Sequence, residues 1–61
     1  PMTPRELIKL LEANGFHKFA HAAHISVFRN ERTGATVLVP VHTKDLGKGL
    51  EQKILKDAGL K

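Results

Sequence analysis

The chain has 61 residues, with ten Lys and Arg against six Asp and Glu, and it contains no Cys, Trp or Tyr. This length holds one small domain with a limited core, and the absence of cysteine excludes disulfides and thiolate metal sites as its supports. The net charge of +4 favours polyanionic partners, whereas three Phe are few for a protein that stacks successive bases. We predict one domain over residues 1–61, with Met2 as the natural first residue. We expect it in the cytoplasm, because no secretory leader or membrane span is visible.

The first predicted element is a helix over about residues 4–13. Thr3 can cap this helix, Pro4 fits its first turn, and Glu6 stands where a capping box requires an acidic residue. The apolar residues that follow share one helix face, and they are Leu7, Ile8, Leu10 and Leu11. Asn14-Gly15 then supplies the left-handed backbone that commonly ends a helix.

Residues 16–24 are ambiguous, because their alanines favour a helix while the two Phe permit a strand. The next two segments predict a β-hairpin, with strands near residues 25–29 and 36–39 and a turn over Asn30–Gly34. Alternation predicts four inward residues, namely Ile25, Val27, Val37 and Val39. It places His24 on the opposite, open face of the sheet, where a ligand can reach it.

A second helix is predicted from about Leu46 to Ala58, ended by Gly59. Its apolar face contains Leu50, Ile54, Leu55 and Ala58. The order is therefore helix, two or three antiparallel strands, helix. This order predicts an α+β fold in which both helices pack on one face of a small sheet.

Residues in both halves of the chain resemble one known family. Arg5–Glu12 followed by Asn14-Gly15-Phe16 looks like its opening helix, and Val39–Leu46 with Gly49 and Ile54–Leu60 is similar to its most specific stretch. The chain therefore resembles the HicA (YcfA-like) family of bacterial toxins that cleave messenger RNA. The resemblance implies a small fold like the double-stranded-RNA-binding domain, endoribonuclease activity without a cofactor, and a HicB-type antitoxin as partner.

The family's catalytic histidine usually follows Gly-Ser at the start of a strand, and here that segment aligns with Ala22-Ala23-His24. The histidine is kept, while alanine replaces both preceding residues. The resemblance implies that His24 is the catalytic histidine. We expect it to act as a general base that withdraws the 2′-hydroxyl proton of RNA, because a neutral imidazole can accept a proton at cytoplasmic pH. From the local sequence alone, a solvent-facing histidine with no function is the simpler interpretation.

His42 and Lys44 lie together before the second helix and are the auxiliary candidates. His42 can act as a general acid, bind phosphate or merely end a strand, and the sequence leaves these alternatives open. The candidate RNA-binding cations are Lys44, Lys48, Lys53, Lys18 and Arg32. A metal site at His17, His21 and His24 requires residues 16–24 to be helical, and we expect none because no cysteine or suitable carboxylate completes a ligand set.

Two other functions remain open at this stage. One is a catalytically degenerate RNA-binding module of the same fold, disabled at Ala22 and Ala23. The other is a protein-interaction domain whose positive charge only aids solubility.

Overall fold

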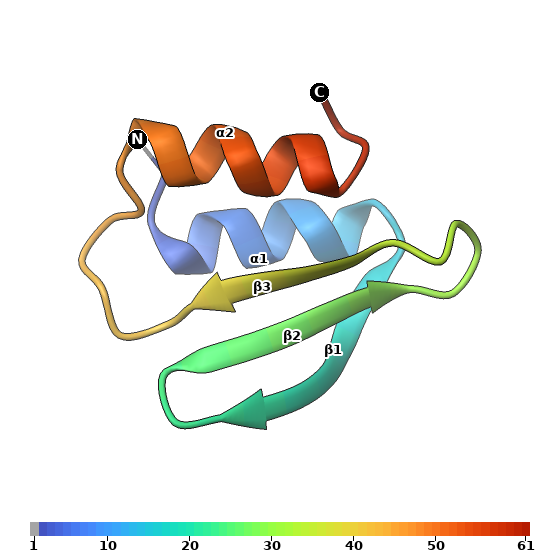
Figure 1. Ribbon diagram of the computed structural model, residues 1–61, viewed down its shortest axis with the longest axis horizontal. Helices are drawn as coiled ribbons and strands as arrows, with labels where there is room; N and C mark the ends of the chain where they lie inside the picture. Colours follow the sequence, from blue (N-terminus) through green and yellow to red (C-terminus); the bar gives the residue numbers. More distant parts are fainter. Residues whose placement is uncertain (1) are drawn as a thin grey trace.

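The computed structural model describes residues 2–61, so Pro1 lies outside the described residues. Along the chain it contains α1 (Pro4–Ala13), β1 (Phe16–Ala22), β2 (Ile25–Asn30), β3 (Thr36–Pro40) and α2 (Lys48–Asp57). The three strands form one antiparallel sheet in the order β1-β2-β3 (Figure 1). The predicted α+β fold is confirmed, and the order of elements is consistent with a double-stranded-RNA-binding-like fold.

The helix α1 has the predicted bounds and the predicted cap. The backbone N–H of Thr3 donates to Oε1 of Glu6 at 2.8 Å, and the backbone N–H of Glu6 donates to Oγ1 of Thr3 at 3.2 Å. These hydrogen bonds satisfy two backbone N–H groups at the start of the helix. Because the carboxylate accepts the Thr3 backbone hydrogen bond, the pKa of Glu6 is lowered from its ordinary value of 4.5.

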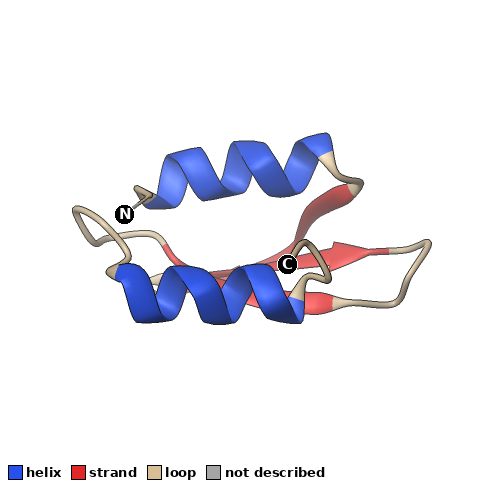
Figure 2. Ribbon diagram, turned by 90° about the horizontal axis from the view of Figure 1, so that it is seen from above, coloured by secondary structure: helices blue, strands red, loops and turns tan. Residues whose placement is uncertain are grey.

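Both helices and the sheet contribute to one hydrophobic core. In Figure 2, α1 lies to one side of the sheet and α2 runs along it, near the edge formed by β3. The core residues are Leu7, Leu11, Phe16, Phe28, Val37, Val39, Leu46, Ile54 and Ala58. No helix within residues 2–61 combines the length and the apolar character that a membrane span requires.

The predicted orientation of β2 is wrong, whereas that of β3 is correct. Ser26, Phe28 and Asn30 are buried toward the helices, while Ile25 and Val27 lie on the open face. The cross-strand partners agree with this arrangement, because Ser26 pairs with buried Val39 and Phe28 with buried Val37. Phe28 is the largest side chain of β2 and gains most from burial, which favours this orientation.

Residues 16–22 form a strand and not the alternative helix. The register between β1 and β2 shifts between Lys18 and Ala20, so Phe19 occupies a β-bulge. Phe19 is 53% exposed, and the Arg29 guanidinium lies over its ring at 4.0 Å from the centroid. This cation–π contact places the Arg29 head group on the open face, where Ile25 and Val27 also lie.

The other end of the sheet is held by Asn30, whose side chain is buried. Its Nδ2 donates to the Asn14 carbonyl at 3.0 Å, and its Oδ1 accepts from the N–H groups of Arg32 and Thr33 at 2.9 and 3.2 Å. Gly15 precedes β1 with φ +92°, and a Cβ there would lie 3.1 Å from Nδ2 of Asn30. One amide therefore joins the end of α1 to the β2–β3 turn.

The helix α2 begins two residues later than predicted. Gly47 occupies the N-cap with φ +71° and provides no side-chain cap. Leu46 instead precedes the helix, where it is buried and its N–H donates to the Met2 carbonyl at 3.0 Å. Leu50 belongs to the predicted apolar face, but it remains 38% exposed while Ile54 and Ala58 enter the core.

Candidate active site

His24 lies at the tip of the β1–β2 hairpin, in a turn formed with Ala23. The N–H of Val41 donates to the His24 carbonyl at 2.8 Å, which extends the β2–β3 pairing one step beyond Ile25 and Pro40. His24 is exposed, as predicted, but it belongs to the turn and not to the open face of a strand. Its backbone is therefore fixed to β3 while its imidazole remains accessible.

The structure brings His42 next to His24, although 17 residues separate them in the sequence. The two imidazole centroids lie 4.9 Å apart, and the ring planes meet edge to face at 88°. Both side chains are exposed. The β1–β2 turn and the loop that leads to α2 meet at the same end of the sheet (Figure 1). This arrangement places two exposed imidazoles side by side at one end of the sheet.

The backbone before His24 differs between the two alanines. Ala23 has φ +52°, a left-handed conformation that glycine adopts without the Cβ penalty. Ala22 does not have positive φ, and it pairs with Ile25 at the end of β1. The turn therefore forms without a glycine at either position, and Ala23 carries the backbone strain.

The predicted cations do not all gather at this site. Lys44 is exposed two residues after His42 in the same loop, and Lys48 is exposed at the first position of α2. Lys53 is instead paired with Asp57, with 2.8 Å between Nζ and Oδ2. Arg32 belongs to the turn at the opposite end of the sheet from His24 (Figure 1).

Lys18 and the two remaining histidines lie along β1. Lys18 is exposed, and its cross-strand partner is the buried Phe28. His17 pairs with Arg29, and its Nε2 lies 3.3 Å from Oε2 of Glu31. His21 pairs with Ser26, and its Nδ1 lies 2.9 Å from Oγ of that serine.

The histidines of β1 do not form a metal site with His24. The bulge at Phe19 turns His17 and His21 to opposite faces of the sheet. Within residues 2–61 no three His, Cys, Asp or Glu side chains are grouped so that they can hold a metal ion.

The hydrogen bond to His21 satisfies the buried hydroxyl of Ser26, a contact that sequence alternation had not predicted.

A comparison with protein families identifies the family of this chain. A family model described as the HicA toxin of bacterial toxin-antitoxin systems matches residues 4–60. The chain belongs to the HicA toxin family. No curated protein matches it at a significant level. Membership implies an antitoxin as the partner of this HicA toxin, and the match covers both the turn at His24 and the loop at His42.

Proposed function

We propose that this HicA toxin is an endoribonuclease that cleaves messenger RNA without a metal ion, with His24 as the general base. RNA carries its own nucleophile in the 2′-hydroxyl group, so the protein has to supply a base, charge stabilisation and alignment. The observation that carries the proposal is the exposed His24 ring, 4.9 Å from the His42 ring and beside the Lys44 loop.

The proposed reaction is a transesterification within the RNA strand. His24 takes the proton of the 2′-hydroxyl, and the 2′-oxygen forms a bond to the adjacent phosphorus. The bond from phosphorus to the 5′-oxygen of the next nucleotide then breaks, and His42 in its protonated form gives that oxygen a proton. The products are a 2′,3′-cyclic phosphate end and a 5′-hydroxyl end. No oxidant, cofactor or external nucleophile is required.

Charge stabilisation is assigned to the lysines around the start of α2. The developing charge on the phosphate is held best by cations that are preorganised close to it. Lys44 and Lys48 are exposed on either side of that helix start, where backbone N–H groups also attract anions. Lys53, Lys18 and Arg32 remain proposals for contacts with more distant phosphates of the same RNA.

The test is cleavage of RNA by the purified protein and by its His24→Ala variant, with a chelator present throughout. General-base catalysis contributes about 10²–10⁴-fold, so the variant should lose cleavage by that factor. RNA binding, measured on the same samples at low salt, should change little. His17→Ala is the matched control, because it removes an exposed histidine from β1 and should leave the rate unchanged.

Equal cleavage by the parent and His24→Ala would contradict the assignment of the base. Binding without products in every variant would instead favour the RNA-binding module, with Ala22 and Ala23 in place of the family's Gly and Ser. RNA affinity that is weak and disappears at moderate salt would favour a protein-interaction domain.

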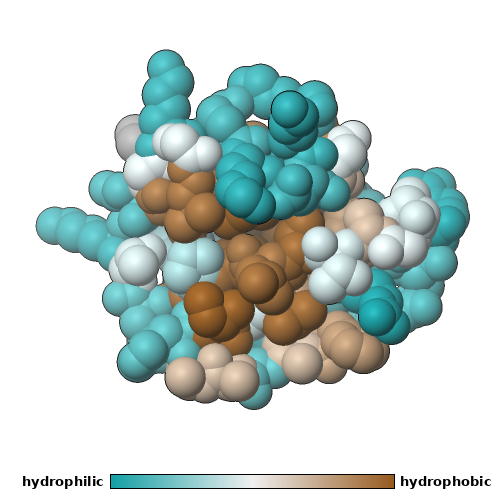
Figure 3. All heavy atoms as spheres, viewed as in Figure 1, coloured by the Kyte–Doolittle hydropathy of each residue, from teal (hydrophilic) through white to brown (hydrophobic). Residues whose placement is uncertain are grey.

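The antitoxin of this toxin is proposed to be a HicB-type protein that covers the active site. Apolar side chains are exposed on the open face of the sheet and beside it, and Figure 3 shows them as a brown patch between α2 and the hairpin. Ile25 is 36% exposed, Leu38 58% and Leu50 38%. An antitoxin with an apolar centre and an acidic rim would complement this patch on a chain of charge +4. Expression should arrest growth, and co-expression of the antitoxin should restore it.

A further inference from the structure

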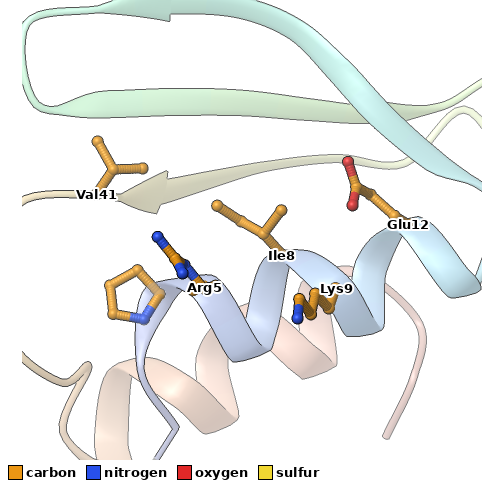
Figure 4. Close-up of a pocket in the computed structure, with 6 residues that line it drawn as sticks. Arg5, Ile8, Lys9, Glu12 and Val41 are labelled. Atoms are coloured by element: carbon orange, nitrogen blue, oxygen red, sulfur yellow. The ribbon is translucent and has the colours of Figure 1, made fainter.

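A groove beside α1 includes Val41, whose backbone N–H donates to the His24 carbonyl and which directly precedes His42. It has a volume of about 460 Å³, within the range of small-ligand sites. Its lining residues are Pro4, Arg5, Ile8, Lys9, Glu12 and Val41. Five of these come from α1, and Val41 comes from the chain just beyond β3 (Figure 4).

Val41 connects the groove to the active site through the backbone. Its N–H donates to the His24 carbonyl at 2.8 Å, and the next residue is His42. In Figure 4, Arg5 extends toward Val41, whereas Glu12 lies at the other end of the groove. The positively charged end is therefore the end that adjoins His24, and the carboxylate is the more distant charge.

The charged side chains of the groove are not engaged within the protein. Among residues 2–61 the ion pairs are His17 with Glu31 and Lys53 with Asp57, so Arg5 and Lys9 have no carboxylate partner. Both side chains are exposed, and Ile8 and Val41 beside them are only partly buried. Free cations next to partly buried apolar side chains suit a ligand that has an anionic part and an apolar part.

We infer that this groove binds the nucleotide next to the scissile bond of a single RNA strand, with Arg5 and Lys9 holding its phosphate and Ile8 and Val41 contacting its sugar and base. The inference rests on the proposed function, because the groove is assigned to RNA through Val41, which bonds to the His24 backbone and precedes His42. It adds α1 to the RNA-binding surface, which the sequence had placed only on β1, the β2–β3 turn and the region around α2.

The experiment measures binding and not cleavage. A fluorescent single-stranded RNA oligonucleotide is titrated with His24→Ala protein at several salt concentrations. The double variant Arg5→Gln, Lys9→Gln is compared with Lys56→Gln, Lys61→Gln, and both are built on His24→Ala. Each pair removes two positive charges from exposed side chains and leaves the net charge of the two proteins equal. The two proteins therefore differ only in where the charges were removed.

The slope of log affinity against log salt should become shallower by about 0.7 in the α1 variant, because Arg5 and Lys9 hold one phosphate and each neutralised phosphate of a single strand contributes about that much. The control variant should keep the parent slope. Equal slopes for the two variants would overturn the inference. A parent protein that binds RNA in this manner but never cleaves it would overturn the proposed function and leave the α1 groove as an RNA-binding site.

Discussion

The imidazoles of His24 and His42 meet edge to face with 4.9 Å between their centroids. Their contact joins the β1–β2 turn to the loop that precedes α2, and the hydrogen bond from Val41 to the His24 carbonyl holds the two segments together. An in-line displacement requires an acid and a base on opposite sides of the phosphorus. Because the two rings are in contact in the free protein, they have to move apart around the phosphate when RNA binds.

We therefore predict that His42→Gln lowers the cleavage rate by about 10²-fold or more while RNA affinity changes little, because the variant cannot donate a proton to the leaving oxygen. The cleavage rate and the RNA affinity should be measured on the same samples at one pH, with His17→Ala as the control. A cleavage rate in His42→Gln equal to that of the parent would assign His42 to a structural role.

We predict that Ala23→Gly stabilises the protein by about 0.5–1 kcal/mol, although glycine usually weakens a fold. Ala23 has φ +52°, and glycine removes the Cβ penalty of that conformation. The matched variant Ala22→Gly lies at the end of β1 without positive φ and should destabilise by about 0.5–1 kcal/mol. Urea unfolding of both variants checks this prediction. A loss of stability in both would show that the turn does not strain Ala23.

Asn30 should be the most sensitive polar residue for stability. Asn30→Ala removes three hydrogen bonds made by one buried side chain and should cost about 2–4 kcal/mol. Asn30→Asp keeps the two acceptor contacts to Arg32 and Thr33 but replaces the donor to the Asn14 carbonyl. It should therefore also destabilise, since a carboxylate oxygen then faces a carbonyl oxygen. Thermal unfolding of both should show lower midpoints than for Thr33→Ala, and midpoints equal to that control would contradict the prediction.

The cap of α1 predicts a small dependence of stability on pH. The pKa of Glu6 is lowered in the folded protein by its hydrogen bonds to Thr3. The stabilisation by the ionised carboxylate is therefore present above the ordinary value of 4.5 and is lost as the pH falls through the lower, folded pKa. Glu6→Gln should show a smaller decrease in its thermal midpoint between neutral pH and pH about 3. Equal decreases in both proteins would exclude this contribution of the cap.

The limits of sequence interpretation are clearest in β2. Alternation within residues 25–30 allows two orientations, and the β-branched Ile25 and Val27 favoured the wrong one. The correct one depends on Phe28 filling the core, on His21 satisfying the Ser26 hydroxyl, and on the side-chain hydrogen bonds of Asn30 to the turn and to Asn14. All three are contacts between separate segments, so a local pattern could not reveal them. The capping box of α1, in contrast, is a local interaction and was predicted correctly.

In the candidate site too, the sequence identified single residues, whereas the contacts between them depend on the fold. The resemblance identified His24, and the local sequence beside Lys44 made His42 a candidate, but only the fold shows that their rings are in contact. Lys53 matched a basic helix face in the sequence, yet it pairs with Asp57. The sequence placed Arg5 and Lys9 only in the opening helix. The groove beside them also needs Val41, which the fold brings next to α1 after β3.

The most direct test of the central claim uses two oligonucleotides that differ by one atom. After the cleaved bond has been mapped in an RNA oligonucleotide, the same strand is prepared with 2′-deoxyribose at the nucleotide that donates the 2′-hydroxyl. We predict that the parent strand is cut to a 2′,3′-cyclic phosphate end and that the deoxy strand is not cut at that bond. Cleavage of both strands at the same rate would contradict a mechanism in which His24 activates the 2′-hydroxyl.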